Sequence, residues 1–206
     1  MADEYSIAIA LVDFIPTFFF PIGVYFFQKF FKKQNFVRSQ ILWIIGGFLV
    51  FIGGFFKAIW KFNMALTQND ILFLSDGLFV FQSVGFTCLL LGTFLFIRSQ
   101  SNKTNIPKST PLTALAVWKI PFMAIQTLTC IGTYGLLIHY GFKKGNKKGA
   151  ILLIISVIII FLMVGLSGSD MSISIQWIAE IINTFGQLSF LLAGITFTKD
   201  LEKIRE

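Results

Sequence analysis

The chain has 206 residues, of which 55% are hydrophobic and only 13% carry a charge. A soluble domain has about 25% charged residues, so most of this protein's surface faces something other than water. The net charge of +7 does not indicate nucleic-acid binding, because the basic residues form short runs between apolar segments and no continuous basic face. We therefore expect an integral membrane protein whose basic runs contact anionic lipid headgroups.

Six apolar segments follow one another along the chain, each near or above the roughly 20 residues that cross a hydrocarbon core. They cover residues 7–27, 41–60, 71–97, 112–140, 150–166 and 174–197. Their continuous hydrophobicity favours helices, because the strands of a membrane barrel alternate apolar and polar residues. The sequence thus predicts an all-α transmembrane helix bundle of six spans, which we expect in the plasma membrane.

A polar linker separates these spans into two groups of three. The chain then divides into a first half (1–97), the linker (98–111), a second half (112–198) and a charged tail (199–206). Because each half has an odd number of spans, the two would insert in opposite directions, which predicts an inverted repeat of the kind that some transporters have. A weak similarity supports this, since Asp13 shortly precedes Pro16 and Lys119 shortly precedes Pro121. Chance similarity between two Phe-rich and Ile-rich halves is the alternative.

The distribution of Lys and Arg along six crossings leaves the membrane orientation nearly balanced. Nine fall on the side of the N-terminus and eight on the other side, whereas the positive-inside rule needs an asymmetry. We expect both termini in the cytoplasm, because the dense cluster between Lys143 and Lys148 and the charged tail then lie inside. The balance leaves open a chain that inserts in both directions and pairs as an antiparallel homodimer.

Glycines recur on one face of the second and third segments. Gly46 and Gly53 are seven residues apart, as are Gly85 and Gly92, a spacing that keeps each pair on one side of a helix. Small residues allow helix backbones to approach closely in membranes. We predict that these two segments pack as a hairpin through their glycines.

Ionised side chains inside the spans are the main candidates for a site. One charge at the centre of a bilayer costs about 2.5–3.5 kcal/mol on insertion scales, so we expect pairing or contact with water. Six crossings place Lys119 and Glu180 near one membrane face, and Asp76 with Lys57 near the other. We predict these two pairs; the alternative for Lys57, and our expectation for Lys61, is an interfacial anchor outside the site.

Polar residues share a helical face with three of these charges. The stripes are Asp76, Ser83 and Thr87; Lys119 and Gln126; and Glu180, Asn183 and Gln187. Polar faces of membrane helices point inward, toward one another or toward water. They therefore predict a path for a substrate or ion, although hydrogen bonding that only fastens helices together explains the same pattern.

Motifs typical of enzymes or cofactor sites are missing from the sequence. No Gly-rich phosphate loop, nucleophile elbow or metal-binding His-Glu helix occurs, and His139 is the only histidine. Cys88 and Cys130 lie in apolar segments and have no disulfide or metal-ligand spacing. We expect neither catalysis nor a cofactor or metal.

The sequence favours a small permease or channel-like transporter with paired intramembrane charges. The alternative is a non-transporting membrane protein, such as a sensor, an assembly partner or a lipid-binding scaffold. A hydrated cavity that reaches Glu180 or Asp76 would favour the transporter, whereas a dry and closed interior would favour the alternative.

Overall fold

A computed structural model describes residues 6–34, 36–100, 120–166 and 172–203, and these ranges are helical with no β-strand. The helices are α1 (Ile7–Val12), α2 (Phe14–Lys33), α3 (Val37–Thr67), α4 (Leu72–Gln100), α5 (Ile120–Lys143), α6 (Lys147–Leu166) and α7 (Ile173–Lys203). The predicted all-α class is confirmed, and most helices extend a few residues beyond the apolar segments.

Five helical segments in the described part of the chain are long and apolar enough to cross a membrane. The first segment, residues 7–33, consists of α1 and α2 together. The other four are residues 37–67, 72–100, 122–143 and 173–200. Large apolar side chains are exposed on the outside of the bundle, among them Phe48, Phe94, Leu128, Phe161 and Phe185. Such surfaces mark contact with lipid in a chain of this composition. The protein is therefore a membrane-embedded helical bundle, and the sixth span, α6, stays a prediction.

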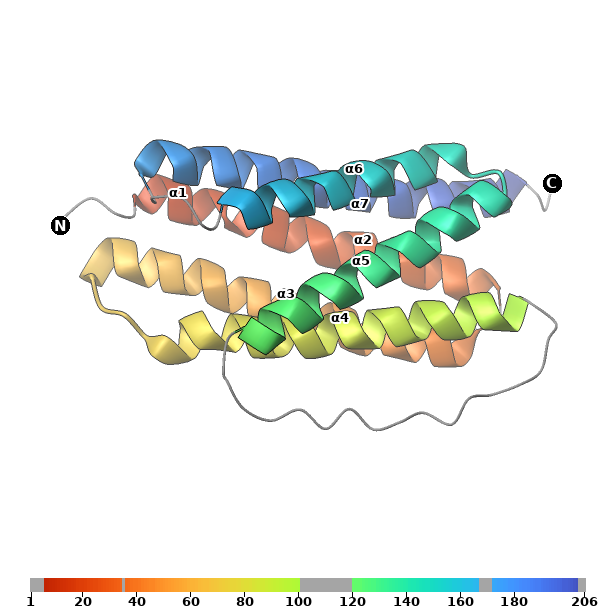
Figure 1. Cartoon of the computed structure of the whole chain (residues 1–206), viewed down its shortest axis with the longest axis horizontal. Coiled ribbons are helices and arrows are strands. Elements are labelled where there is room, and N and C mark those ends of the chain that lie inside the picture. Colours follow the sequence, from red (N-terminus) through yellow and green to blue (C-terminus); the bar gives the residue numbers. More distant parts are fainter. Residues whose placement is uncertain (1–5, 35, 101–119, 167–171, 204–206) are drawn as a thin grey trace.

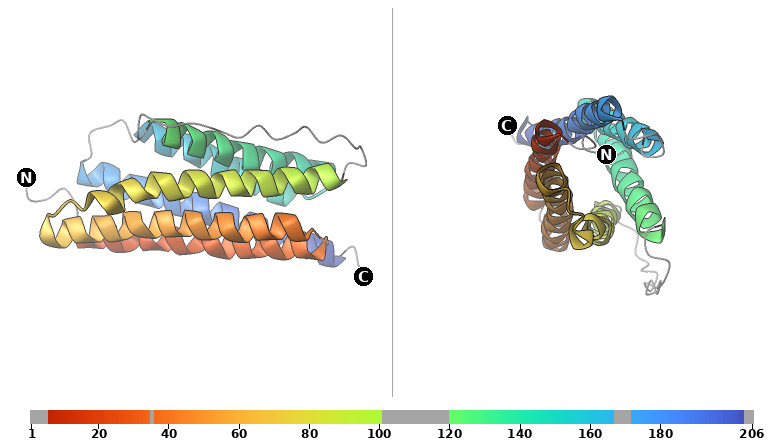
Figure 2. Two further views of the ribbon diagram at one scale, coloured as in Figure 1. Left: turned by 90° about the horizontal axis from the view of Figure 1, so that it is seen from below. Right: turned by 90° about the vertical axis from the view of Figure 1, so that its left-hand side faces the viewer.

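The helices form a ring in chain order. Each of α2 to α6 packs against the next helix, and α7 closes the ring against α2 (Figure 2). Short helix α1 lies against α3 and α7. The ring thus places all six long helices around one interior.

Contacts between helices reveal their relative directions. Side chains of Gln82 and Gln126 are hydrogen-bonded near the beginnings of α4 and α5, whereas Phe96 and Tyr140 pack together near their ends. These two helices are therefore parallel. Helices α2 and α7 are parallel as well, and the two chain termini lie at opposite ends of the bundle (Figure 1).

Both halves consequently run in the same direction, which corrects two expectations. The described helices lack the predicted inverted arrangement of the halves, and the termini do not share one side (Figure 1). The physical reason is that α4 ends and α5 begins at opposite ends of the bundle, which counting apolar segments does not reveal. We call the end where α2 begins the N-terminal end, and the other the C-terminal end.

The predicted glycine hairpin is present between α3 and α4. A Cβ on Gly46 would lie 2.6 Å from the carbonyl oxygen of Gly85, so only glycine permits this approach. A Cβ on Gly92 would lie 2.8 Å from the ring of Trp43. The Trp43 indole donates a hydrogen bond of 3.2 Å to the Thr93 hydroxyl, which also ties the two helices together.

Aromatic side chains fill the core of the C-terminal half of the bundle. Helices from both halves contribute to this aromatic cluster, which comprises Phe27, Phe30, Phe31, Trp43, Phe96, Tyr140, Phe190 and Phe197. Their ring centroids are separated by 4.8–5.5 Å where Phe27, Phe31 and Phe96 meet their neighbours. Such packing is dense and leaves the open space of the ring at the N-terminal half.

Candidate functional site

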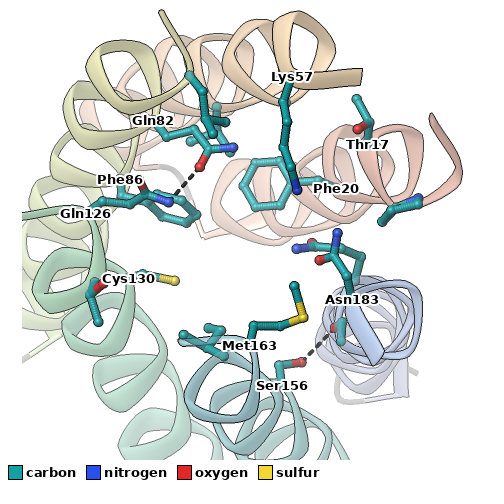
Figure 3. A pocket seen from close by; sticks show the side chains of 18 of the residues that line it. Thr17, Phe20, Lys57, Gln82, Phe86, Gln126, Cys130, Ser156, Met163 and Asn183 are labelled. Atoms are coloured by element: carbon teal, nitrogen blue, oxygen red, sulfur yellow. Dashed lines mark hydrogen bonds between the residues drawn. The ribbon is translucent and has the colours of Figure 1, made fainter. Parts of the chain in front are cut away.

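A cavity of about 280 Å³ lies inside the ring, toward the N-terminal end (Figure 3). All six long helices contribute to its wall. The polar lining residues are Asp13, Thr17, Lys57, Gln82, Gln126, Thr127, Ser156, Asn183 and Gln187. Phe20, Phe86 and Tyr134 are among the apolar ones. An interior of this kind offers charged groups, hydrogen-bonding groups and aromatic surface together.

Four ionised side chains form a cluster beside the cavity. Lys61 donates a hydrogen bond to Glu180 and its Nζ lies 3.2 Å from Asp13 Oδ2. Lys57 Nζ lies 3.8 Å from Asp13 Oδ1. Asp13 and Glu180 are 2% and 1% exposed. The two acids and two lysines have no net charge together, as the cost of isolated charge in hydrocarbon requires.

The backbone at the junction of α1 and α2 positions Asp13. Pro16 has no N–H to donate to the carbonyl of Val12, and its ring crowds that carbonyl. The helix is interrupted at Asp13 for this reason, and the Thr17 hydroxyl donates a hydrogen bond of 3.0 Å to the Asp13 carbonyl. This break directs the carboxylate toward α3 and α7, where its partners lie.

Glu180 forms an ion pair with Lys61, and its predicted pair with Lys119 stays a prediction. Lys119 lies outside the described residues, and Glu180 contacts Lys61 of α3. Glu180 is near the start of α7, and α7 is parallel to α2, so Glu180 lies at the N-terminal end. The count of six alternating crossings had placed it at the other end. Lys61 is 9% exposed and ion-paired, so its expected role as an interfacial anchor is wrong.

The polar stripe predicted on α4 does not line the cavity. The Ser83 hydroxyl donates to the carbonyl of Val80, and the Thr87 hydroxyl donates to that of Ser83, so both hydroxyls bond within their own helix. Asp76 is partly buried near the start of α4 and is not among the lining residues either. Lys57 lies beside Asp13, and the predicted pair of Asp76 and Lys57 stays a prediction.

Three other predicted residues do lie on the cavity wall: Gln126, Asn183 and Gln187. The Gln126 amide donates a hydrogen bond of 2.6 Å to the Gln82 carbonyl, which joins the two halves across α4 and α5. Figure 3 shows Lys57 of α3 and Asn183 of α7 extending toward the same part of the cavity. A role of these residues in a transport path stays a prediction.

Sequence reasoning missed Asp13, Lys61 and Gln82. One indication was available, because Lys57 and Lys61 are four residues apart on one helical face and lie at the same end as Asp13. Their connection to Glu180 needed the direction of α7. Gln82 has no sequence feature that separates it from its neighbour Ser83.

Comparison with protein-family models, with curated proteins and with solved structures finds no match for this chain. Within the described ranges, no group of three or more His, Cys, Asp or Glu side chains is placed to hold a metal ion. The polar side chains on the cavity wall offer hydrogen bonding and ion pairing.

Proposed function

We propose that this protein is a small permease that moves a small polar solute through the centre of the helix ring. The cavity is the observation that carries the proposal, because both halves line it and a buried ion cluster adjoins it. Ligand pockets usually measure about 300–1,000 Å³, so a volume of about 280 Å³ suits a small solute. Helices fastened only by polar contacts would pack to the density of a protein interior and need no such space.

We propose alternating access in which two clusters, one toward each end of the bundle, close the cavity in turn. Toward the N-terminal end lies the ion cluster, in which Lys61 of the first half holds Glu180 of the second. Toward the C-terminal end lies the aromatic cluster. Movement of one three-helix half against the other would open one closure while the other stays shut, as parallel repeats do in known transporters.

We also propose that α6 crosses the membrane and that the protein resides in the plasma membrane. Helices α5 and α7 both run from the N-terminal to the C-terminal end, so the chain between them must return. Helix α6 packs antiparallel to α7, as shown by the contact of Gly149 with Thr196 and of Gly186 with Ile159. Its 20 residues span roughly 30 Å at 1.5 Å per residue, the thickness of a hydrocarbon core.

Uptake by proteoliposomes tests the proposed transport. The purified full chain is reconstituted in phosphatidylcholine and phosphatidylglycerol vesicles, and uptake of labelled L-lactate, L-alanine and mannitol is compared with that of empty vesicles. We expect at least one solute to enter faster, and Glu180→Gln to slow it about tenfold or more. A neutral amide neither forms the ion pair with Lys61 nor exchanges a proton.

Asp200→Asn is the matched control, because it makes the same chemical change on the same helix at the C-terminal end. We expect this variant to transport at the wild-type rate. Wild-type protein that folds, inserts and accelerates none of the solutes would favour a non-transporting scaffold. Full activity of Glu180→Gln would show that the ion cluster only fastens helices.

A further inference from the structure

We propose that the cavity binds a small hydroxycarboxylate together with one proton. The inference rests on the proposed function, since it names the substrate class of the same cavity. Three observations carry it: the placement of Lys57, the charge balance of the ion cluster, and two hydrogen-bond acceptors on the wall.

Lys57 is placed to bind the carboxylate. Its side chain is 29% exposed, against 11% for Lys61, and it extends into the cavity (Figure 3). Its Nζ lies 3.8 Å from Asp13, a longer separation than the 3.2 Å between Lys61 and the same carboxyl group. An ammonium group hydrogen-bonds strongly to a carboxylate, so a bound organic acid would engage Lys57.

Charge balance accounts for the proton. Helices α3 and α7 pack against the segment that holds Asp13, and within the described ranges the charged groups that form ion pairs there are Lys57 and Lys61 of α3 and Glu180 of α7. These four groups sum to zero, so a bound carboxylate adds one uncompensated negative charge within the bilayer. Uncompensated charge is costly there. If Asp13 or Glu180 takes up a proton from water, the ion cluster and the bound carboxylate together have no net charge. Carboxylate and proton then cross the membrane together, with no net movement of charge.

Two acceptors on the wall indicate that the solute also carries a donor. The side-chain carbonyl oxygens of Gln126 and Gln187 are buried and have no hydrogen-bond partner. A buried acceptor left without a donor costs about 1–3 kcal/mol, so a ligand hydroxyl would be favoured there. Phe20 and Phe86 offer apolar surface for a short carbon chain. A 2-hydroxy acid such as lactate combines these three features.

Calorimetric titration tests the inference directly. L-lactate is titrated into the purified full chain in two buffers of different ionisation enthalpy, and the difference gives the number of protons taken up. We expect about one proton per bound lactate. In proteoliposomes, we expect an inward proton gradient to accelerate lactate uptake and an imposed membrane potential to leave the initial rate unchanged.

Two variants separate the parts of the proposal. Lys57→Gln should weaken lactate binding about tenfold or more, whereas Lys29→Gln, the same change on an exposed lysine at the C-terminal end, should not. Asp13→Asn leaves the cluster with one positive charge, so lactate should still bind but without proton uptake. Thermal unfolding of each variant verifies that it is folded.

The outcomes distinguish this inference from the proposed function. Lactate binding without proton uptake by the wild type would overturn the coupling. Uptake of alanine or mannitol but not of lactate would overturn the substrate class while transport itself stands. Binding and uptake of none of the three solutes would overturn both proposals.

Discussion

At the scale of residues, Lys61 is the side chain on which the buried charges depend. It contacts both acids, and those acids come from different parts of the ring, since Asp13 precedes α2 and Glu180 belongs to α7. Loss of one partner from a buried ion pair typically costs about 3–5 kcal/mol, because the other charge stays buried without compensation. Replacing both partners by apolar groups costs much less.

We therefore predict that Lys61→Met lowers the free energy of unfolding by about 3–5 kcal/mol. Adding Glu180→Leu should restore most of this loss, because the remaining pair of Lys57 and Asp13 is neutral. The measurement is a double-mutant cycle from unfolding of the purified variants in detergent. Losses that simply add would show that Lys61 and Glu180 are not coupled.

At the scale of elements, the approach of α3 and α4 depends on glycines that lack a Cβ. Gly46 and Gly85 face each other's backbone, and a Cβ added at Gly53 would lie 2.8 Å from the Gln82 side chain. The same hairpin positions Gln82 on the cavity wall. The seven-residue spacing predicted this pairing correctly, because helix periodicity and a short connection are both local properties of the chain.

Gly46→Ala should therefore destabilise the protein by about 1–3 kcal/mol, since a methyl group meets the backbone of the neighbouring helix. Gly54→Ala is the matched control on the same helix, because its Cβ would make only ordinary contacts, 3.5 Å from the Thr17 side chain and 3.9 Å from that of Gln82. Alanine also favours a helix over glycine by up to about 1 kcal/mol, so the control should lose no stability. Equal unfolding midpoints for both variants would contradict the close approach of α3 and α4.

At the scale of the whole molecule, the observed helix directions divide the basic residues unevenly. Two of those described lie at the N-terminal end, Lys57 and Lys61, and both belong to the ion cluster. Eleven lie at the C-terminal end: Lys29, Lys32, Lys33, Arg38, Arg98, Lys143, Lys144, Lys147, Lys148, Lys199 and Lys203. The sequence had suggested nearly equal numbers of Lys and Arg on the two sides of the membrane. That count assumed the opposite direction for the helices of the second half.

The positive-inside rule then predicts a C-terminal end in the cytoplasm, against anionic headgroups, and an N-terminal end outside. In a background where Cys88 and Cys130 are replaced by Ser, Asn69→Cys and Lys144→Cys place one thiol at each end. We expect a membrane-impermeant maleimide to label Asn69→Cys in intact cells and Lys144→Cys only after permeabilisation. The reverse pattern would invert the orientation, and labelling of both would restore dual insertion.

Composition and periodicity by themselves determined that this chain is a helical membrane protein with a glycine-packed hairpin, and they placed Gln126, Asn183 and Gln187 on inward faces. These properties follow from hydropathy and helix geometry, which act over a few turns of chain. Only the tertiary structure decided that α5 is parallel to α4, and hence that Glu180 meets Lys61 and Asp13. A pairing between distant residues depends on which end of the bundle each occupies, and long-range packing of helices sets that.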